Sequence, residues 1–337
     1  MATLDIFNND AFRLSALTQT IIDIPRVPTQ IGDSGLYSSA GMTGVVMMIE
    51  RKGSELKLVP TSPRGGVPEP VHTKGRKLIP VAAVHMAESW NVQADEILGV
   101  RAFGSEDETV PILQLVRERM ALAKNQMDLT HEYHRVGGIK GQVLDADGTS
   151  VLYDMYDLFG MTKQTLKTNI DNPASTTDPK ATSLTIKRMI KAKLGGRSFT
   201  GVKAYVAADY FDKLVGHDKM KKAWELWNNG AYLRQQQNED DFEFAGVRYT
   251  VYEGGTDAGD FIPAGKGYAF PTGVPNMFQT LFAPAPFIET VGSMGLPYYA
   301  KQKQNDWGSA IDGLAVSCPL YLNTLPEAVI ELDSSAP

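Results

Sequence analysis

The stretch that decides the fold is MTGVVMMIERKGSELKLVPTSPRGGVPEPV, residues Met42–Val71. Side chains alternate between two faces over positions 45–50, which predicts a β-strand. The residues of Arg51–Ser54 predict a turn, after which Leu56 and Leu58 mark the return strand. Four prolines, at positions 60, 63, 68 and 70, then predict an extended strap. One compact domain gains little from such a hairpin and strap, so we expect them to contact another molecule.

The composition excludes several classes of protein. The chain has 337 residues, of which 43% are hydrophobic and 21% charged, values typical of a globular protein and not of a disordered one. A net charge of −6 argues against a tight, sequence-reading nucleic-acid binder, although it is compatible with a wall that faces nucleic acid. The single cysteine, Cys318, excludes an intrachain disulfide and fits a reducing compartment. The N-terminus lacks a signal-peptide pattern, and no run of 18 apolar residues predicts a membrane span.

The strongest helix prediction covers Thr109–Val136. Acidic residues precede its start, and Pro111 suits a first helical turn. An apolar seam recurs at steps of three and four residues, and we expect Gly137–Gly138 to end the helix. This seam consists of Leu113, Val116, Met120, Ala123 and Met127. About 28 residues at ~1.5 Å each give a rod about 40 Å long, which is more than most single cores need.

The remaining pattern predicts a mixture of helices and strands. A helix is expected within 10–24, broken by Pro25 and Pro28, and another from Asp178 to the glycines at 195–196. Further predicted elements are a strand at 77–85, a hairpin at 141–152, a strand at 202–206, two helices within 210–227, a hairpin at 242–252, short strands at 268–270 and 287–291, and apolar runs at 314–322 and 328–332. This order indicates an α+β fold rather than a regular βαβ series.

Sequence motifs for metal, calcium and phosphate binding are incomplete. His131 and His134 are three residues apart on the long helix, whereas a zinc protease needs a spacing of four, so a solvated helix face is the preferred interpretation. The segment at Asp145–Gly148 resembles a calcium loop but has Tyr156 at the twelfth position, so a hairpin turn is expected. The segment GDFIPAGKG, 259–267, departs from a phosphate loop in its glycine spacing and its proline.

No catalytic, cofactor or metal residue is nominated. Cys318 precedes a proline in an apolar run and is expected to be a buried small hydrophobe. Trp224 and Trp227 are three apart on a predicted helix, which favours packing. Carboxylates are scattered without a definable acid/base pair, so the sequence predicts that the protein is not an enzyme.

An ordered series of residues in the first part of the chain resembles a known family. It comprises Asp10, Phe12, Leu17-Thr18, Ile24-Pro25, Pro28, Gly32, Gly35-Leu36, Thr43, Ile49-Glu50, Gly53, Leu56, Leu58-Val59-Pro60 and Arg64-Gly65, with Asp306-Trp307, Ser317 and Pro319-Leu320 near the end. The series is similar to the lambda-type major head proteins, the phage major capsid protein E family. It departs from that pattern at 38–42, where small residues replace an expected acidic residue and a valine at the junction of arm and loop.

The resemblance implies the tailed-phage capsid fold of the Hong Kong 97 type. The ranges then expected are an N-terminal arm at 1–41, an extended loop at 42–76, a peripheral domain at 77–198 with a spine helix at 109–136, an axial domain at 199–305, and C-terminal strands at 306–337 that return to the peripheral domain.

The same resemblance implies a major capsid protein of a tailed bacteriophage. Copies would assemble in the host cytoplasm into hexamers and pentamers of an icosahedral virion shell around double-stranded DNA, which is faced but not specifically bound. No scaffold-like region precedes the arm, so a separate scaffolding protein and no proteolytic trimming are expected, together with a portal. Binding of a decoration protein is left open, and no cofactor or membrane is implied.

Four basic residues of the loop are the predicted inter-subunit contacts. They are Arg51, Lys52, Lys57 and Arg64, which stand out on an acidic protein and are expected to meet carboxylates of a neighbouring copy; Phe12 and Tyr37 of the arm are added to them. The alternative is a solvated hairpin tip. Two other functions stay open: a nanocompartment shell of the same fold that encloses an enzyme, and an enzyme with a non-local hydrolase site.

Overall fold

The structure, a computed structural model, describes residues 13–27, 29–51, 77–98, 109–172, 177–229, 241–256, 259–307 and 309–336. Its helices are α1 Leu14–Asp23, α2 Ala94–Leu98, α3 Thr109–Lys140, α4 Met155–Phe159, α5 Pro179–Leu194, α6 Ala208–Gly216 and α7 Lys221–Asn229, with 3-10 turns η3 Ile288–Thr290 and η4 Pro326–Ala328. Its strands are β1 Ser38–Gly41, β2 Val46–Arg51, β3 Lys77–Ala82, β4 Met86–Gln93, β5 Gln142–Leu144, β6 Val151–Asp154, β7 Gln164–Lys167, β8 Gly201–Val206, β9 Asp241–Phe244, β10 Val247–Val251, β11 Gly255–Thr256, β12 Gly259–Asp260, β13 Lys266–Thr272, β14 Phe278–Phe282, β15 Tyr299–Gln304, β16 Ala310–Ser317, β17 Pro319–Asn323 and β18 Ile330–Asp333.

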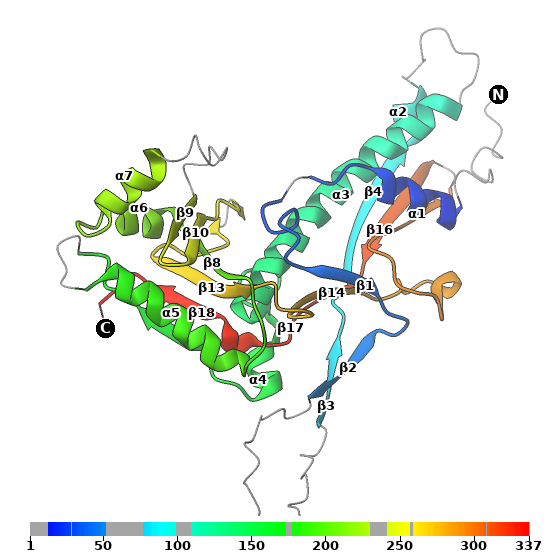
Figure 1. The fold of residues 1–337 in the computed structure, drawn as a ribbon. Coiled ribbons are helices and arrows are strands. Elements are labelled where there is room, and N and C mark those ends of the chain that lie inside the picture. The colour runs from blue at the N-terminus through cyan, green and yellow to red at the C-terminus, as the bar shows by residue number, and fades with distance from the viewer. Residues whose placement is uncertain are drawn as a thin grey trace, which may run out of the picture.

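The long helix α3 runs between two lobes and contributes to the core of each (Figure 1). Its first half buries Val116, Met120 and Met127, as the apolar seam predicts, against the sheet of β4, β16 and β15. Its last turns bury Val136 and Ile139 in the core of the other lobe. Because one rigid element belongs to both cores, α3 is a spine for the molecule.

The predicted end of α3 is wrong by one turn. The helix passes through Gly137 and Gly138 and stops at Gly141, whose φ of 83° is a left-handed conformation that favours glycine. The two earlier glycines are needed for close packing instead. A Cβ at Gly138 would lie 2.5 Å from the Tyr37 hydroxyl, and one at Gly137 would lie 3.0 Å from a backbone oxygen.

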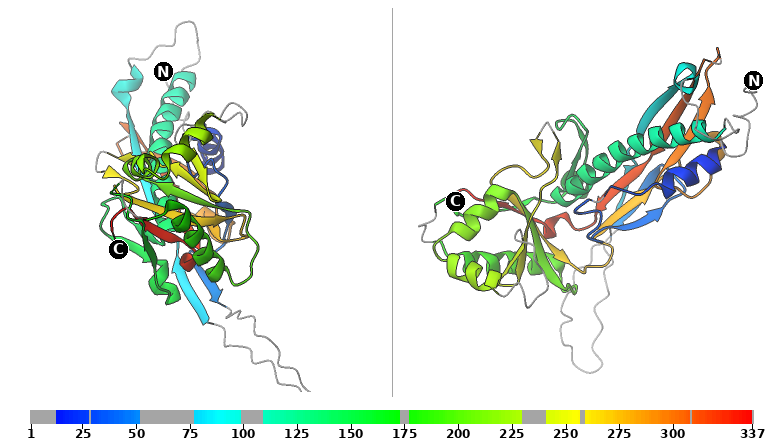
Figure 2. Two further views of the ribbon diagram at one scale, coloured as in Figure 1. Left: turned by 60° about the vertical axis from the view of Figure 1, so that its left-hand side comes forward. Right: turned by 90° about the horizontal axis from the view of Figure 1, so that it is seen from above.

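The elongated lobe is built on the antiparallel sheet β15-β16-β4, with α1 beside β15 and α3 beside β4 (Figure 2). Leu17 and Ile21 of α1 are buried with the α3 seam in this core. Trp90 of β4 lies directly over Gly313 of β16, its register partner. A glycine is required there, because a Cβ would lie 1.9 Å from the indole ring.

The second lobe, here called the six-stranded lobe, has the mixed sheet β7-β18-β13-β8-β10-β9. Figure 1 shows α5 on one side of this sheet and α6 and α7 on the other, which explains why β8 and β13 are buried along most of their length. The limits of α5 follow the prediction. The Asp178 side chain accepts from the Lys180 amide at 3.1 Å, and Gly195 ends the helix at φ 58°.

Most short elements match the pattern, and the strand predicted at 287–291 is wrong. Residues 287–291 contain η3 instead of a strand, because the Thr290 hydroxyl donates to the carbonyls of Ala285 and Phe287 and closes a turn. Among the described residues, β2 pairs with β3 in antiparallel register. The predicted return strand through Leu56 and Leu58 lies within 52–76, outside the described residues.

The predicted domain ranges remain predictions, and the sheets do not follow them strand by strand. β7 and β18 lie outside 199–305 yet belong to the six-stranded sheet, whereas β14 and β15 lie inside that range and join other sheets. Within 306–337, β16 and β17 pair with β15 and β14. The chain therefore crosses between the lobes more than once.

Candidate subunit-contact site

The ribbon formed by β2 and β3 extends away from the body and has two different faces (Figure 1). Its inner face buries Ile79 and Val81 against Leu281 and Leu320 of β14 and β17. Its outer face carries apolar residues that are exposed to solvent, and the register places Glu50 on the same face, opposite Leu78. The exposed apolar residues are Val46, Met48, Leu78, Pro80 and Ala82. A two-stranded ribbon is marginal on its own, and an exposed apolar strip of this kind marks an interaction surface.

The outer end of the ribbon is basic. Arg51 and Lys77 are register partners on the two strands, and the sequence adds Lys52 and Arg76 next to them. Like charges at opposed positions of a ribbon destabilise it. The register therefore places two basic residues opposite each other at this end, and their contacts with a neighbouring copy stay a prediction.

Only part of the predicted contact set falls within the described residues. Phe12, Lys52, Lys57 and Arg64 lie outside them, and for Arg51 the structure gives the strand position without the side chain.

Tyr37 is described in full. Its hydroxyl donates to the Arg135 carbonyl at 2.7 Å, so it ties the arm to α3 of its own chain. The roles of all six residues in inter-subunit contact stay predictions.

A row of charged side chains on α3 holds the arm that precedes the ribbon. Lys124, Asp128 and Glu132 follow each other at steps of four, so they lie on one face of the helix. Lys124 donates to the carbonyls of Ile21 (2.8 Å) and Ile22 (3.2 Å), the last turn of α1, where a cation is favoured. Burial lowers the pKa of Lys124.

The two carboxylates of the row, Asp128 and Glu132, accept hydrogen bonds from backbone N–H groups of the arm. Asp128 accepts from Val27 at 3.3 Å. Glu132 accepts from Ile31 at 2.6 Å and from Gly32 at 3.1 Å. We call Lys124, Asp128, Glu132 and the segment 21–32 the arm clasp. It holds the described arm on its own subunit, so this part of the arm is not free to reach a neighbour.

The clasp was missed in the sequence, although a signal existed. Lys124, Asp128 and Glu132 each lie one position after a seam residue, at 123, 127 and 131, so they border the buried face of α3. Buried charges require partners, so this spacing could have predicted a polar segment packed beside the seam. The Glu132–Arg135 ion pair at 3.1 Å is part of the same buried face, with side chains 4% and 10% exposed.

The prediction that His131 and His134 lie on a solvated face is wrong, because both rings are buried. They fall at positions 4 and 7 after Met127 and therefore continue the seam. The His131 Nε2 lies 3.2 Å from the Ser317 hydroxyl, and its Nδ1 contacts the Tyr321 hydroxyl. Burial, with a smaller effect of the nearby Arg135 cation, holds the pKa of His131 well below its ordinary value. Burial lowers the pKa of His134 to about 4.

Other sequence interpretations are confirmed. Asp147 accepts from the Thr149 and Ser150 amides at 2.9 and 2.8 Å, which makes a hairpin turn of the calcium-like segment. Cys318 is buried, and burial raises the pKa of its thiol to about 11. Trp224 and Trp227 both pack edge-on against Phe242.

The phosphate-loop-like segment does not offer a free lysine in the structure. Lys266 donates to Glu331 at 2.6 Å, while Phe261 and Ile262 are buried. Among the described residues, no three His, Cys, Asp or Glu side chains are placed to share a metal ion. Within the same ranges, neither α3 nor any shorter helix has the length and apolar composition needed to traverse a bilayer.

The family model for phage major capsid protein E matches residues 13–334. The chain belongs to that family. Two relatives in the capsid family are named major capsid proteins. The one from Salmonella phage Felix O1 is 24% identical, over 96% of this chain and 97% of the relative. The one from Pseudomonas phage KPP10 is 23% identical, over 86% of this chain and 87% of the relative.

Solved structures similar to this family member confirm the fold. A phage-related protein from Bordetella bronchiseptica has a TM-score of 0.55 at 13% identity, over 95% of this chain and 96% of that one. The bacteriophage PhiM1 mature capsid has a TM-score of 0.53 at 12% identity, over 93% and 89%. The capsid of an empty GTA particle has a TM-score of 0.55 at 11% identity, over 93% of this chain and 94% of that one. The α+β fold of tailed-phage capsid proteins, expected from the resemblance, is therefore confirmed.

Proposed function

We propose that copies of this chain build the icosahedral shell of a tailed-phage head around packaged double-stranded DNA. The observation that carries the proposal is the capsid family match over residues 13–334. The ribbon supports it from the structure, because Val46, Met48 and Leu78 on its outer face are exposed to solvent in the described part of the subunit. The virion capsid is then the location of the protein, after assembly in the host cytoplasm.

The contacts between copies are assigned to the loop and its base. Arg51, Lys52, Lys57 and Arg64 would meet carboxylates of a neighbour, with Phe12 and Tyr37 contributing from the arm. Head-to-tail contacts of one kind close into rings when the rotation allows it, which yields hexamers and pentamers. Every subunit makes several such contacts at once, so modest interfaces add up to a stable shell.

The DNA, scaffold and portal belong to the same proposal. A net charge of −6 favours confinement of DNA without specific binding. A separate scaffolding protein and a portal would guide closure of the shell. Tight, salt-sensitive binding of duplex DNA by the free chain would contradict the passive role of the wall.

The decisive experiment is electron microscopy of the expressed chain, with and without a scaffold partner from the same source. Closed particles are expected from the native sequence. The double reversal Arg51→Glu/Lys52→Glu should leave a folded chain that forms no particles. The control Lys180→Glu/Lys222→Glu changes the net charge equally at exposed positions on α5 and α7, and should assemble normally.

Two results would count against the proposal. A chain that stays monomeric at high concentration with every scaffold partner would remove shell assembly. Particles that hold a protein cargo and no DNA would instead favour the nanocompartment function. Normal particles from the Arg51/Lys52 variant would leave the shell in place and remove the basic loop from its contacts.

A further inference from the structure

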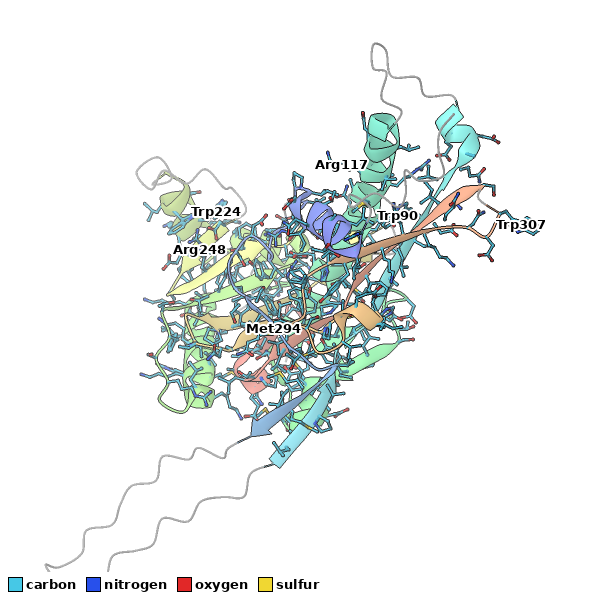
Figure 3. The ribbon with its side chains drawn as sticks, turned by 90° about the vertical axis from the view of Figure 1, so that its right-hand side faces the viewer. Trp90, Arg117, Trp224, Arg248, Met294 and Trp307 are labelled. Carbon is cyan, nitrogen blue, oxygen red and sulfur yellow. The ribbon has the colours of Figure 1, made fainter. Side chains whose placement is uncertain are left out.

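Trp307 lies at the end of the β15–β16 hairpin with 91% of its side chain exposed. Figure 3 shows it projecting beyond the strands, away from the body of the molecule. The hairpin that carries it is held in one shape by Asn305. The Asn305 side-chain amide donates to the Ser309 hydroxyl at 2.9 Å, and its oxygen accepts from the Ser309 backbone at 2.9 Å. A large indole next to a residue with such cross-hairpin bonds is the kind of residue that anchors an interface, because tryptophan is enriched among the residues that dominate binding.

A cleft of about 670 Å³ lies between the start of α1 and the η3 loop. Leu14, Met294 and Leu296 form its apolar walls, of which the last two are 61% and 40% exposed, and Tyr299 lies in its floor. The Tyr299 hydroxyl accepts from the Leu296 amide at 2.9 Å and so fixes the rim. The cleft is therefore a preformed, partly apolar hollow.

The cleft is lined by β15 from Tyr299 to Gln302, and Trp307 lies beyond the far end of that strand. Three residues of strand at ~3.3 Å each, about 10 Å, separate Gln302 from Asn305, and Trp307 lies two residues further along the chain. Figure 3 shows Met294 far from Trp307. The indole of one chain therefore cannot fill the cleft of that same chain, whereas it can fill the cleft of another copy.

We propose that Trp307 of one subunit inserts into the α1–η3 cleft of a neighbouring subunit. A projection beyond the end of a strand and a hollow along that strand make a head-to-tail contact, the type that propagates into rings or sheets of subunits. The inference rests on the proposed shell function and adds a specific contact to it, separate from the loop 42–76.

The charges around the two parts are complementary. Asp306 precedes the tryptophan, and Arg13, Lys301 and Glu289 line the cleft, which leaves a net positive charge there. Lys301 already pairs with Glu289 at 2.7 Å and is 41% exposed, so a second carboxylate can approach it. Burial of an indole removes about 150–250 Å² from water, enough for it to be the main contributor to a small contact.

The first test compares assembly of Trp307→Ala with that of the native sequence, by light scattering and electron microscopy. A hot-spot residue contributes at least ~2 kcal/mol, so the concentration needed for assembly should rise about thirty-fold. Leu226→Ala, which removes a 74% exposed side chain on α7, is the matched control and should assemble normally. Circular dichroism checks that each variant is folded.

The second test locates the contact. The double variant Ser15→Cys/Asp306→Cys should give a ladder of disulfide-linked oligomers on a non-reducing gel after mild oxidation of assembled particles. Asp306→Cys/Leu226→Cys should not give a ladder, and the native Cys318 is buried and should stay unreactive.

Assembly of Trp307→Ala at the native concentration, or absence of the ladder, overturns this inference while the shell function stands. Occupation of the cleft by the segment before Arg13 would produce that same result. Failure of the native chain to assemble counts against the proposed function itself.

Discussion

Replacement of Glu132 by alanine gives the sharpest test of the arm clasp. The native carboxylate accepts from the Ile31 and Gly32 amides and from the Arg135 guanidinium at 3.1 Å. It also accepts from the Tyr252 hydroxyl at 3.4 Å. The variant leaves a buried guanidinium, the buried Ile31 N–H and the half-buried Gly32 N–H without this acceptor. Removal of one member of a buried ion pair costs about 3–5 kcal/mol, so we expect the free energy of unfolding to fall by that amount.

Urea unfolding of the unassembled chain measures the loss, and limited trypsin digestion localises it. The bond after Arg26 lies within the clasp, so trypsin should cleave it faster in Glu132→Ala than in the native chain. Glu118→Ala is the control on the same helix, because Glu118 is exposed and bonded only to the Gln114 side chain in the described contacts. It should change stability by no more than about 0.5 kcal/mol. Equal stability of the two variants, with unchanged cleavage at Arg26, would refute the clasp.

Two further predictions concern the buried histidines and the tight glycine. Because burial lowers the pKa of His134 from 6.5 to about 4, the unfolded chain takes up a proton in that window before the folded chain does. The free energy of unfolding should therefore fall as the pH drops from 6.5 toward 4, by up to ~1.4 kcal/mol per pH unit. Urea unfolding between pH 5 and 7 measures this slope, and His134→Gln should flatten it. An unchanged slope in the variant would contradict the prediction. Gly313→Ala, which places a Cβ 1.9 Å from the Trp90 ring, should cost at least about 1–3 kcal/mol in thermal unfolding. Gly216→Ala, with open space around it at the end of α6, should be neutral or stabilising by up to ~1 kcal/mol, and equal effects of the two glycine variants would count against the packing argument.

Local sequence signals were sufficient to predict the bounds of helices whose first and last residues are marked by capping residues. Asp178 and Gly195 bound α5 in the structure as they do in the sequence, since capping depends on neighbouring residues alone. The α3 seam was predictable for the same reason. Its end was not, because Gly138 packs against the distant Tyr37 and Gly137 against the strand that follows the helix, and a glycine looks identical in sequence whether it ends a helix or allows close packing.

Long-range pairing could not be obtained from the pattern. The partner of β2 lies more than twenty residues further along the chain, at Lys77–Ala82, while the nearer Leu56 and Leu58 offered an equally alternating strand. The candidate contact residues followed from charge and resemblance. Trp307 and its cleft required coordinates, because exposure of a tryptophan is a property of the whole fold.

The arm clasp has a consequence for how such proteins diverge. α3 recognises the arm through carbonyl and amide groups of its main chain, at Ile21, Ile22, Val27, Ile31 and Gly32. The exposed side chains of the arm can thus be exchanged without loss of these hydrogen bonds, provided that proline does not replace an amide donor, whereas Leu17, Ile21 and Ile31 are buried and stay constrained by packing. The acidic and basic positions of the helix have no such freedom.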